Sequence, residues 1–308
     1  TTRLVFQAIR RARPLRLYVV SDGARSEHFG ESEVVDSVRR YIETNIDWPC
    51  TLYKKYSDVN AGCMASVTAG ISWFFENEEL GIILEDDCLP SQSFFLFCDE
   101  LLKKYINDTR IGQISGYNYI ANTYNIKESY LYATSGSIWG WATWGRVARG
   151  FNPMDSYLVS KEAISKIQEF GATSDEIKHI VKSINTVITG DVDTWDYSWS
   201  AYMRINKYLT IIPCKNMIRN IGFGPNATHT KISNSYSIPS CDEIEFPLIH
   251  PLHVTANHAY KTVLINEIKK ISGHKKCMQR IKYKIKQIVS KILTTMQKAI
   301  SWQMSNSI

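Results

Sequence analysis

The 308-residue sequence lacks the features that mark several classes of protein. It has no run of about 18 apolar residues, so no part of it is predicted to span a bilayer as a helix. None of its seven cysteines belongs to a Cys-x-x-Cys pair, which excludes a zinc knuckle and gives no sign of a disulfide framework. No Gly-x-Gly-x-x-Gly motif follows a predicted strand, which disfavours a dinucleotide-dependent dehydrogenase. What remains is a chain of ordinary globular composition, with 44% hydrophobic and 21% charged residues.

The charges are unevenly distributed along the chain. Residues 261–308 contain eleven Lys and Arg and a single acid, Glu267, for a net charge of +10. Because the whole chain carries +6, residues 1–260 carry −4. A nucleic-acid binder would have its basic surface on the folded part of the chain, so no nucleic-acid partner is predicted. Unpaired thiols are typical of a reducing compartment, and we therefore predict a cytoplasmic protein.

Helix and strand patterns alternate in the first part of the chain. Apolar residues at helical spacing predict helices at 2–13, 34–42 and 63–75. Short apolar runs predict strands at 15–20, 51–56 and 81–84. This alternation predicts an α/β fold with a mixed, mostly parallel sheet flanked by helices. Ligands of such sheets bind beyond the carboxyl ends of the strands, where the polar clusters of this sequence are expected to converge.

The second part of the chain has a different pattern. It is predicted to contain strands at 111–115 and 209–213, a dense aromatic segment at 130–144, helices at 160–188 and 194–206, and a glycine-rich loop at 220–230. No Pro/Ser/Gly-rich linker separates the two parts. We therefore expect one continuous domain with a first half at 1–110 and a second half at 111–260, followed by a basic tail at 261–308.

The sharpest feature is the acidic triplet Glu85-Asp86-Asp87 at the end of the strand predicted at 81–84. Three adjacent acids repel one another, and a hard divalent cation that also binds substrate phosphates would compensate their charge. Such a cation would neutralise a departing diphosphate. The alternative is structural, because Asp87 and Ser91 also suit the cap of the following helix.

The run Gly-Ile-Ile-Leu-Glu-Asp-Asp-Cys-Leu-Pro-Ser-Gln-Ser-Phe-Phe at 81–95 resembles the donor-metal motif of GT-A glycosyltransferases. It is most similar to the inverting N-acetylglucosaminyltransferase I and O-mannose N-acetylglucosaminyltransferase group. Bacterial nucleotide-diphospho-sugar transferases resemble residues 1–260 more closely still. Their pattern includes Trp-Gly-Trp-Ala-Thr-Trp at 139–144, Trp-Asp-Tyr at 195–197, Asn-Ile-Gly-Phe-Gly at 220–224 and Ala-Thr-His-Thr at 227–230.

The resemblance implies a Rossmann-like GT-A domain that uses Mn²⁺ or Mg²⁺. It also implies that residues 1–110 form the nucleotide-sugar-binding half and residues 111–260 the acceptor-binding and catalytic half. Asp87 would bind the metal directly, while Glu85 and Asp86 would shape the site and contact the sugar or ribose of the donor. In these relatives a central strand and an Asn-Arg-Pro loop precede the Thr-Thr-Arg with which this sequence begins. We therefore expect that strand to lie upstream of residue 1 or to be lost.

The resemblance also assigns two loops to the nucleotide. Asp22, in the turn Ser-Asp-Gly, matches the position that reads the base, with Gly23 beside it. Asn60 and Gly62 match the loop that passes close to the nucleotide. Each has an ordinary alternative, because Asp-Gly is a favourable turn and Asn is a common loop residue.

Asp196 is the candidate general base, because an inverting transfer needs a carboxylate to take the proton of the acceptor hydroxyl. The better-known relatives have Trp-Asp-Asp-Trp here, so Asp191 and Asp193 remain possible substitutes. Trp195 and Trp199 could stack on a sugar ring. The alternative is that Asp196, or Asp193, only caps the helix predicted at 194–206.

The glycine-rich loop and the tail add two further predictions. His229 could ligate the metal or bind the diphosphate, in a loop that closes over the donor, or it could simply be solvated. Residues 275–304 form a basic amphipathic pattern that suits an anionic membrane surface. The same apolar stripe could instead dock on the body of the protein or on another protomer.

Together these patterns predict an inverting, metal-dependent glycosyltransferase of hexosyl or N-acetylhexosaminyl type. Its donor would be a nucleotide-diphosphate sugar, with a UDP-sugar as the leading candidate, and its acceptor the hydroxyl of a glycan or lipid-linked saccharide in polysaccharide biosynthesis. Two alternatives stay open. One is a sugar-nucleotide nucleotidyltransferase, although no Gly-rich loop with Arg or Lys lies near the first strand. The other is a non-catalytic carbohydrate- or membrane-binding protein derived from a transferase.

Overall fold

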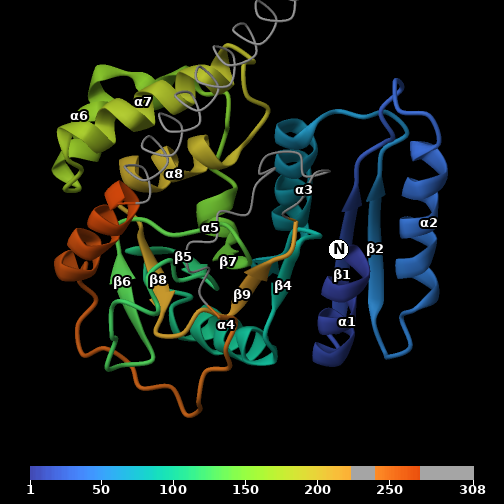
Figure 1. The fold of residues 1–308 in the computed structure, drawn as a ribbon, viewed down its shortest axis with the longest axis horizontal. Helices are drawn as coiled ribbons and strands as arrows, with labels where there is room; N and C mark the ends of the chain where they lie inside the picture. The colour runs from blue at the N-terminus through green and yellow to red at the C-terminus, as the bar shows by residue number, and fades with distance from the viewer. Residues whose placement is uncertain (223–239, 271–308) are drawn as a thin grey trace, which may run out of the picture. The chain divides into compact units, whose positions relative to one another are not determined.

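The computed structural model describes residues 1–222 and 240–270 (Figure 1). The chain divides into two compact units, Thr1–Lys261 and Thr262–Ile308. The architecture below is that of the first unit. His229 and the amphipathic pattern at 275–304 lie outside the described residues. No helix in the described ranges combines the length and apolar character needed to cross a bilayer.

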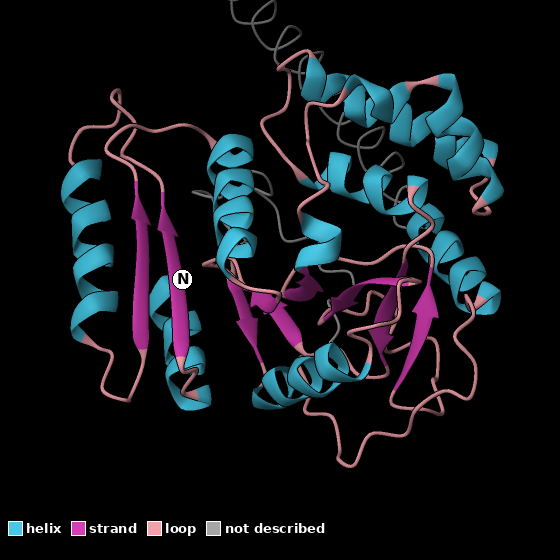
Figure 2. Ribbon diagram, turned by 180° about the vertical axis from the view of Figure 1, so that it is seen from behind, coloured by secondary structure: helices cyan, strands magenta, loops and turns pink. Residues whose placement is uncertain are grey.

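The first elements alternate as the sequence predicts. They are α1 (Thr2–Ala12), β1 (Arg16–Ser21), α2 (Glu31–Thr44), β2 (Thr51–Tyr56) and α3 (Cys63–Asn77). β1 and β2 pair in parallel, from Arg16 opposite Thr51 to Ser21 opposite Tyr56. Figure 2 shows these two strands side by side, apart from the other strands.

The two faces of β1 are covered by different helices because successive side chains of a strand point to opposite sides. Leu17 and Val19 pack with the α1 and α2 residues Phe6 and Ile42. On the other face, the ring of Tyr18 meets that of Phe74 of α3 at 4.9 Å between centroids. This two-sided packing fixes the direction in which β1 and β2 deliver their following loops.

The main sheet has five strands in the order β3-β7-β5-β8-β6. They are β3 (Leu80–Ile83), β5 (Ile111–Ser115), β6 (Tyr130–Ala133), β7 (Trp141–Trp144) and β8 (Leu209–Pro213). Only β5 and β8 pair in parallel, whereas the β3–β7, β5–β7 and β6–β8 pairs are antiparallel. The sheet is therefore mixed, and the prediction of a mostly parallel sheet is corrected. The reason is that the aromatic segment supplies two strands that run against their neighbours.

Helices cover both faces of this sheet. On one face, the side chains of α4 (Gln92–Lys104) pack on those of β5, β6, β7 and β8 in a cluster that includes Phe94, Phe97 and Leu101. On the other face lie α3, α5 (Gly145–Ala148) and α8 (Asp196–Ile205), around the buried indole of Trp141. α3 thus contacts both β1 and the main sheet, and its N-terminus lies beside the loops that carry the polar clusters.

Two further strands, β4 (Cys88–Pro90) and β9 (Ile218–Asn220), form an antiparallel pair directly after the acidic triplet. Neither was predicted from the sequence, because each is only three residues long. Among the described strands, β1 pairs only with β2 and β3 only with β7. The pairing of β4 with β9 places the start of the glycine-rich loop beside Asp87.

The helix predicted at 160–188 is two helices, α6 (Lys161–Glu169) and α7 (Ser174–Ile188). Gly171 has a φ of 91°, which ends the first helix, and Thr173 opens the second with a capping box closed by Glu176. The Thr-x-x-Glu pattern that marks this break was present in the sequence. The 3-10 turn η1 (Ser156–Val159), α6, α7 and α8 enclose a separate apolar cluster around Ile184.

One contact ties the two parts of the first unit together at the start of α3. The carboxylate of Asp193, from the loop before α8, accepts hydrogen bonds from the backbone N–H groups of Cys63 (2.6 Å) and Met64 (2.9 Å). Gly62 makes this approach possible, because a Cβ there would lie 2.5 Å from Asp193 Oδ2. Its φ of 85° and ψ of 168° are also accessible almost only to glycine.

We expect Gly62→Ala to lower the free energy of unfolding by at least about 2 kcal/mol. About 1 kcal/mol would come from the backbone conformation and a similar amount from the displaced cap. Urea unfolding followed by circular dichroism measures this loss. The matched control is Gly30→Ala, where φ is also positive, at 79°, but a Cβ meets nothing within 4 Å. Equal losses in the two variants would contradict the role of Gly62 in admitting Asp193.

Candidate active site

A cavity of about 430 Å³ lies where α3, the end of β3 and α8 meet. Its lining includes Cys63 at the start of α3, Glu85 just after β3 and Asp196 at the start of α8. The loop 134–139 and the strand residues Gln113 and Thr210 complete it. This volume is within the range of cavities that bind small molecules.

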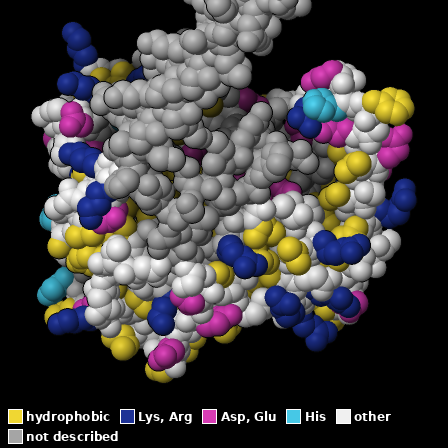
Figure 3. All heavy atoms as spheres, viewed as in Figure 1, with side chains coloured by type: hydrophobic (Ala, Val, Ile, Leu, Met, Phe, Trp, Pro, Cys, Tyr) yellow, Lys and Arg dark blue, Asp and Glu magenta, His cyan; other side chains and the backbone are white. Residues whose placement is uncertain are grey.

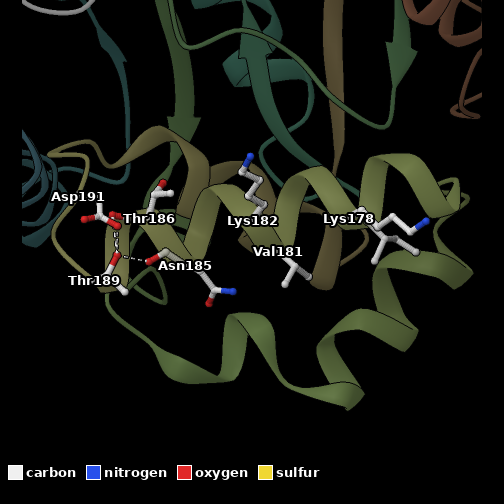
Figure 4. Close-up of a pocket in the computed structure, with 8 residues that line it drawn as sticks. Lys178, Val181, Lys182, Asn185, Thr186, Thr189 and Asp191 are labelled. Atoms are coloured by element: carbon white, nitrogen blue, oxygen red, sulfur yellow. Dashed lines mark hydrogen bonds between the residues drawn. The ribbon is translucent and has the colours of Figure 1, made fainter.

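A larger groove, of about 540 Å³, runs along the exposed face of α7 (Figure 4). Apart from Asp191 it is lined by α7 and by Thr189, which follows it, and its charged residues are Lys178, Lys182 and Asp191. The Asp191 carboxylate accepts a hydrogen bond from the Thr189 hydroxyl at 2.7 Å. Because no set of reactive groups from different elements converges there, we place the candidate site in the smaller cavity.

Acidic side chains from distant parts of the sequence gather around the cavity. Burial and the charges of Glu85, Asp193, Asp196 and Asp22, in decreasing order of effect, raise the pKa of the Cys63 thiol to about 11. A thiol responds in this way only to carboxylates that lie near it. The structure therefore brings together the acidic groups that follow β1 and β3 and those that precede or begin α8.

Asp22 stabilises the loops that follow β1 and β2. Its carboxylate accepts hydrogen bonds from the backbone N–H groups of Gly23, Ala61 and Gly62, each at 3.0 Å. The amide of Asn60 donates to the carbonyl of Gly23 at 2.8 Å. A Cβ at Gly23 would lie 2.5 Å from the backbone of Val59. These contacts join the loops after β1 and β2, and they favour the structural interpretation of Asp22 and Asn60.

Glu85 is the most strongly perturbed carboxylate of the site. Burial, and then the charges of Asp87, Asp196 and Asp86, raise its pKa to about 7, against the opposing hydrogen bond from Trp195. The influence of Asp196 on Glu85 places these two carboxylates in the same electrostatic environment, and both line the cavity. Near neutral pH, Glu85 therefore exchanges its proton readily.

Asp87 lies beside Glu85 and Cys88, and potential ligand atoms of these three residues all lie within 4.8 Å of one another. Burial raises the pKa of Asp87. The Cys88 thiol donates to Asp87 Oδ1 at 3.3 Å, and burial raises its pKa as well. The backbone closes tightly here, because a Cβ at Gly222 would lie 2.2 Å from Asp87 Oδ2.

The donor set suits a hard divalent cation. Among the described residues, Glu85, Asp86, Asp87 and Asp196 form no ion pair with a Lys, Arg or His. Partly buried carboxylates without a counter-charge are unfavourable, and a cation would relieve that repulsion. Carboxylate oxygens of Glu85 and Asp87 are ligands that Mg²⁺ and Mn²⁺ prefer, whereas a protonated Cys88 thiol is not.

Asp86 differs from its two neighbours because it is exposed. Its Oδ2 accepts hydrogen bonds from the hydroxyls of Thr1 (2.8 Å) and Thr2 (3.2 Å). Figure 3 shows basic side chains on the side of the molecule that holds α1, β1 and β2. Two basic residues of these elements, Arg10 and Arg16, pair with Asp47 and Glu78. No described ion pair joins a basic side chain of this region to the acidic triplet.

Of the three aspartates left open as general base, only Asp196 lines the cavity. Asp193 is used as the cap of α3, and Asp191 lies at the α7 groove. Asp196 is the first residue of α8, and its carboxylate accepts a hydrogen bond from the hydroxyl of Thr194. It does not cap α8, because the N-cap residue is Trp195 and no side chain makes the cap hydrogen bond.

The tryptophans beside Asp196 are core residues, which corrects the prediction that they stack on a sugar. Trp195 and Trp199 are only 2% and 1% exposed. Their rings pack against Trp141, with centroids 5.6 Å and 4.9 Å away, and Trp199 Nε1 donates to Gln113 Oε1 at 2.9 Å. Their faces are covered because α8 lies against the main sheet.

The accessible aromatic wall of the cavity comes from other residues. Trp139 and Tyr119 both line it, and Tyr119 is 46% exposed. Tyr117 supports both rings, with centroids 4.8 Å from each. The sequence analysis missed Tyr119 as a site residue, because it lies in an irregular segment that no pattern marked.

Several polar residues of the cavity were also missed. They are Cys63, Gln113, Thr134, Ser135, Ser137, Ser200, Arg204 and Thr210. Gln113 carried a usable signal, since it is a polar residue in the middle of an apolar strand. Its side-chain amide donates to the carbonyl of Ser137 at 2.7 Å and so holds the loop 134–139 against the sheet. The others come from several elements and meet only through tertiary packing.

Comparison with models of known protein families and with curated protein sequences finds no match for this chain. The assignment of the site therefore depends on its own geometry and electrostatics.

We expect the stability of the metal-free protein to fall as the pH rises from about 4.5 to 7. Because the folded-state pKa of Glu85 is about 7 and its ordinary value is 4.5, the folded state holds the proton more often than the unfolded state in this window. The loss should reach about 2–3 kcal/mol. Urea unfolding near pH 5 and pH 8 with a chelator measures it.

The Glu85→Gln variant should lack this component and lose less stability over the same window. Glu33→Gln, at an exposed position on α2, is the matched control and should follow the wild type. If Glu85→Gln shows the same pH dependence as the wild type, Glu85 does not carry the shift.

Proposed function

We propose that this chain is a metal-dependent glycosyltransferase of the GT-A type. It transfers a sugar from a nucleotide-diphosphate donor, a UDP-sugar, to a hydroxyl of a glycan or lipid-linked saccharide. The observation that carries the proposal is the convergence on one cavity of unpaired carboxylates from distant elements. Glu85 follows β3 with Asp87 next to it, and Asp196 begins α8.

Asp87 and Glu85 would hold Mn²⁺ or Mg²⁺, which when bound supplies positive charge to a leaving diphosphate. The chain itself supplies the rest of the chemistry. Asp196 accepts the proton of the acceptor hydroxyl as that oxygen attacks the sugar carbon, which is the role of a general base. A base that is separate from the metal-binding carboxylates suits transfer with inversion of configuration.

The aromatic wall of Trp139 and Tyr119 suits the apolar face of a sugar ring, and the hydroxyls of the loop 134–137 suit its polar edge. This division would place the acceptor against the loop and the donor phosphates at the acidic triplet. Membrane contact through 275–304 stays a separate prediction, because those residues lie outside the described ranges.

Asp87→Asn should weaken the Mn²⁺-dependent part of UDP binding. Loss of a charged ligand in a partly buried site should weaken that binding by a factor of ~10 to 100. Calorimetric titration of UDP with and without Mn²⁺ measures the effect. Asp99→Asn is the control, because Asp99 is an exposed carboxylate of α4 that pairs with Lys103. Metal-independent UDP binding in the wild type would contradict the metal centre, and no nucleotide binding at all would favour a non-catalytic carbohydrate-binding protein.

Asp196→Asn should reduce the rate of sugar transfer or of UDP-sugar hydrolysis by a factor of ~100 to 10,000, because the general base is removed. Binding of UDP with Mn²⁺ should stay unchanged. Release of UDP from a panel of UDP-sugars measures the rate. Asp191→Asn, at the α7 groove, serves as the control. Full activity of Asp196→Asn would assign the base to another group.

A further inference from the structure

Arg204 is a cation inside the cavity that the proposed chemistry does not use. It lies in the last turn of α8 and lines the same cavity as Asp196, which begins that helix. Eight residues of α-helix separate the two positions by about 12 Å along the axis. The guanidinium itself reaches back to Ser200, which lies one helical turn after Asp196. The cavity therefore presents both a cation and carboxylates along the same helix.

Within the described residues, the guanidinium of Arg204 forms only part of the hydrogen bonds that it can donate. Its Nη1 donates to the carbonyl of Ser200 at 3.0 Å and to the hydroxyl of the same residue. No other described group accepts from it, so its remaining N–H groups have no partner in this part of the chain. A guanidinium has five N–H donors in a planar fork, which suits two oxygens of one anion.

No described carboxylate forms an ion pair with Arg204. The acid that influences it is Glu176 of α7, and the carboxylate of Glu176 is already bound by Lys261 Nζ at 3.0 Å and by the backbone N–H of Thr173 at 2.8 Å. Burial lowers the pKa of Arg204, although a guanidinium stays charged in proteins. A half-buried charge with neither ion pair nor full hydrogen bonding is unfavourable, and an anionic ligand would reduce that cost.

Several residues that line the cavity with Arg204 carry hydroxyl groups. Ser200, Thr134, Ser135 and Thr210 line the cavity with it, and Thr210 is only 2% exposed. Space is limited at the loop, because a Cβ at Gly136 would lie 2.5 Å from the Thr210 methyl group. Hydroxyl groups beside one guanidinium can complete the hydrogen bonds of a carboxylate or phosphate.

We infer that Arg204 and the hydroxyls around it form a subsite for an oxyanion on the acceptor, either a sugar carboxylate or a sugar phosphate. The assignment of the bound anion to the acceptor depends on the proposed function. The binding of an anionic saccharide at Arg204 does not depend on it. The donor diphosphate is assigned to the acidic triplet, where a metal ion would bind it, so the guanidinium beside Ser200 is free for the acceptor.

The test uses the full chain without metal or nucleotide and compares two matched pairs of probes. Methyl β-glucuronide is compared with methyl β-glucoside, and glucose 1-phosphate with glucose, by ligand-observed NMR titration. We expect one anionic probe to bind at least ~10 times more tightly than its neutral partner. The probe pair that shows this difference in affinity identifies whether the subsite prefers a carboxylate or a phosphate.

Arg204→Gln should remove this discrimination, and Arg204→Lys should keep only part of it, because a lysine has charge but no planar fork. Arg40→Gln, at an exposed position on α2, is the matched control and should behave as the wild type. Thermal melting checks that each variant is folded, and Arg204→Lys keeps the test decisive if Arg204→Gln does not fold.

Equal binding of charged and neutral probes by the wild type would overturn the inference. So would undiminished discrimination in Arg204→Gln, or a loss of Mn²⁺-dependent UDP binding in that variant, which would place Arg204 on the donor. Because the probe titrations contain no metal and no nucleotide, failure of the proposed transferase function leaves their outcome unchanged. Failure of the anion subsite in turn leaves Mn²⁺-dependent UDP binding intact.

Discussion

The carboxylate of Asp193 caps a helix that belongs to the other half of the chain, and the arrangement of the site depends on this contact. By accepting the N–H groups of Cys63 and Met64, it fixes the loop before α8 at the N-terminus of α3. Asp196 follows three residues later and is thereby held at the cavity that Glu85 also lines. Gly62 is required because no side chain fits between the cap and the helix.

The acidic residues near the cavity differ in role. The carboxylates of Asp22 and Asp193 accept hydrogen bonds from backbone N–H groups of the loops after β1 and β2 and of the start of α3. These hydrogen bonds stabilise their negative charge. Glu85 and Asp87 have no described counter-cation, and burial raises the pKa of each. The carboxylates therefore divide into those that cap backbone groups and those that a cation could bind. The raised pKa of Glu85 reflects its burial first and then the charges of Asp87, Asp196 and Asp86.

The cavity is polarised along α8. Its first turn presents Asp196 to the cavity, and its last turn carries Arg204, whose guanidinium binds Ser200. The buried ring stack of Trp141, Trp195 and Trp199 holds this helix rigidly against the main sheet. A ligand with a cation-binding phosphate at one end and an anion at the other would match that polarity. This match connects the proposed transfer reaction with the inferred anion subsite.

The sequence by itself determined the local elements and the sharpest part of the site. Periodicity and turn residues predicted the bounds of α1, β1, β2 and α3 to within a few residues, because helix and strand patterns depend on neighbouring residues. The three acids that follow an apolar strand likewise identified Glu85 to Asp87. Only the tertiary structure decided which aspartate near α8 faces the cavity, that Trp195 and Trp199 are buried, and that Arg204 lines the cavity. Those outcomes depend on how segments distant in sequence pack together, which no local pattern encodes.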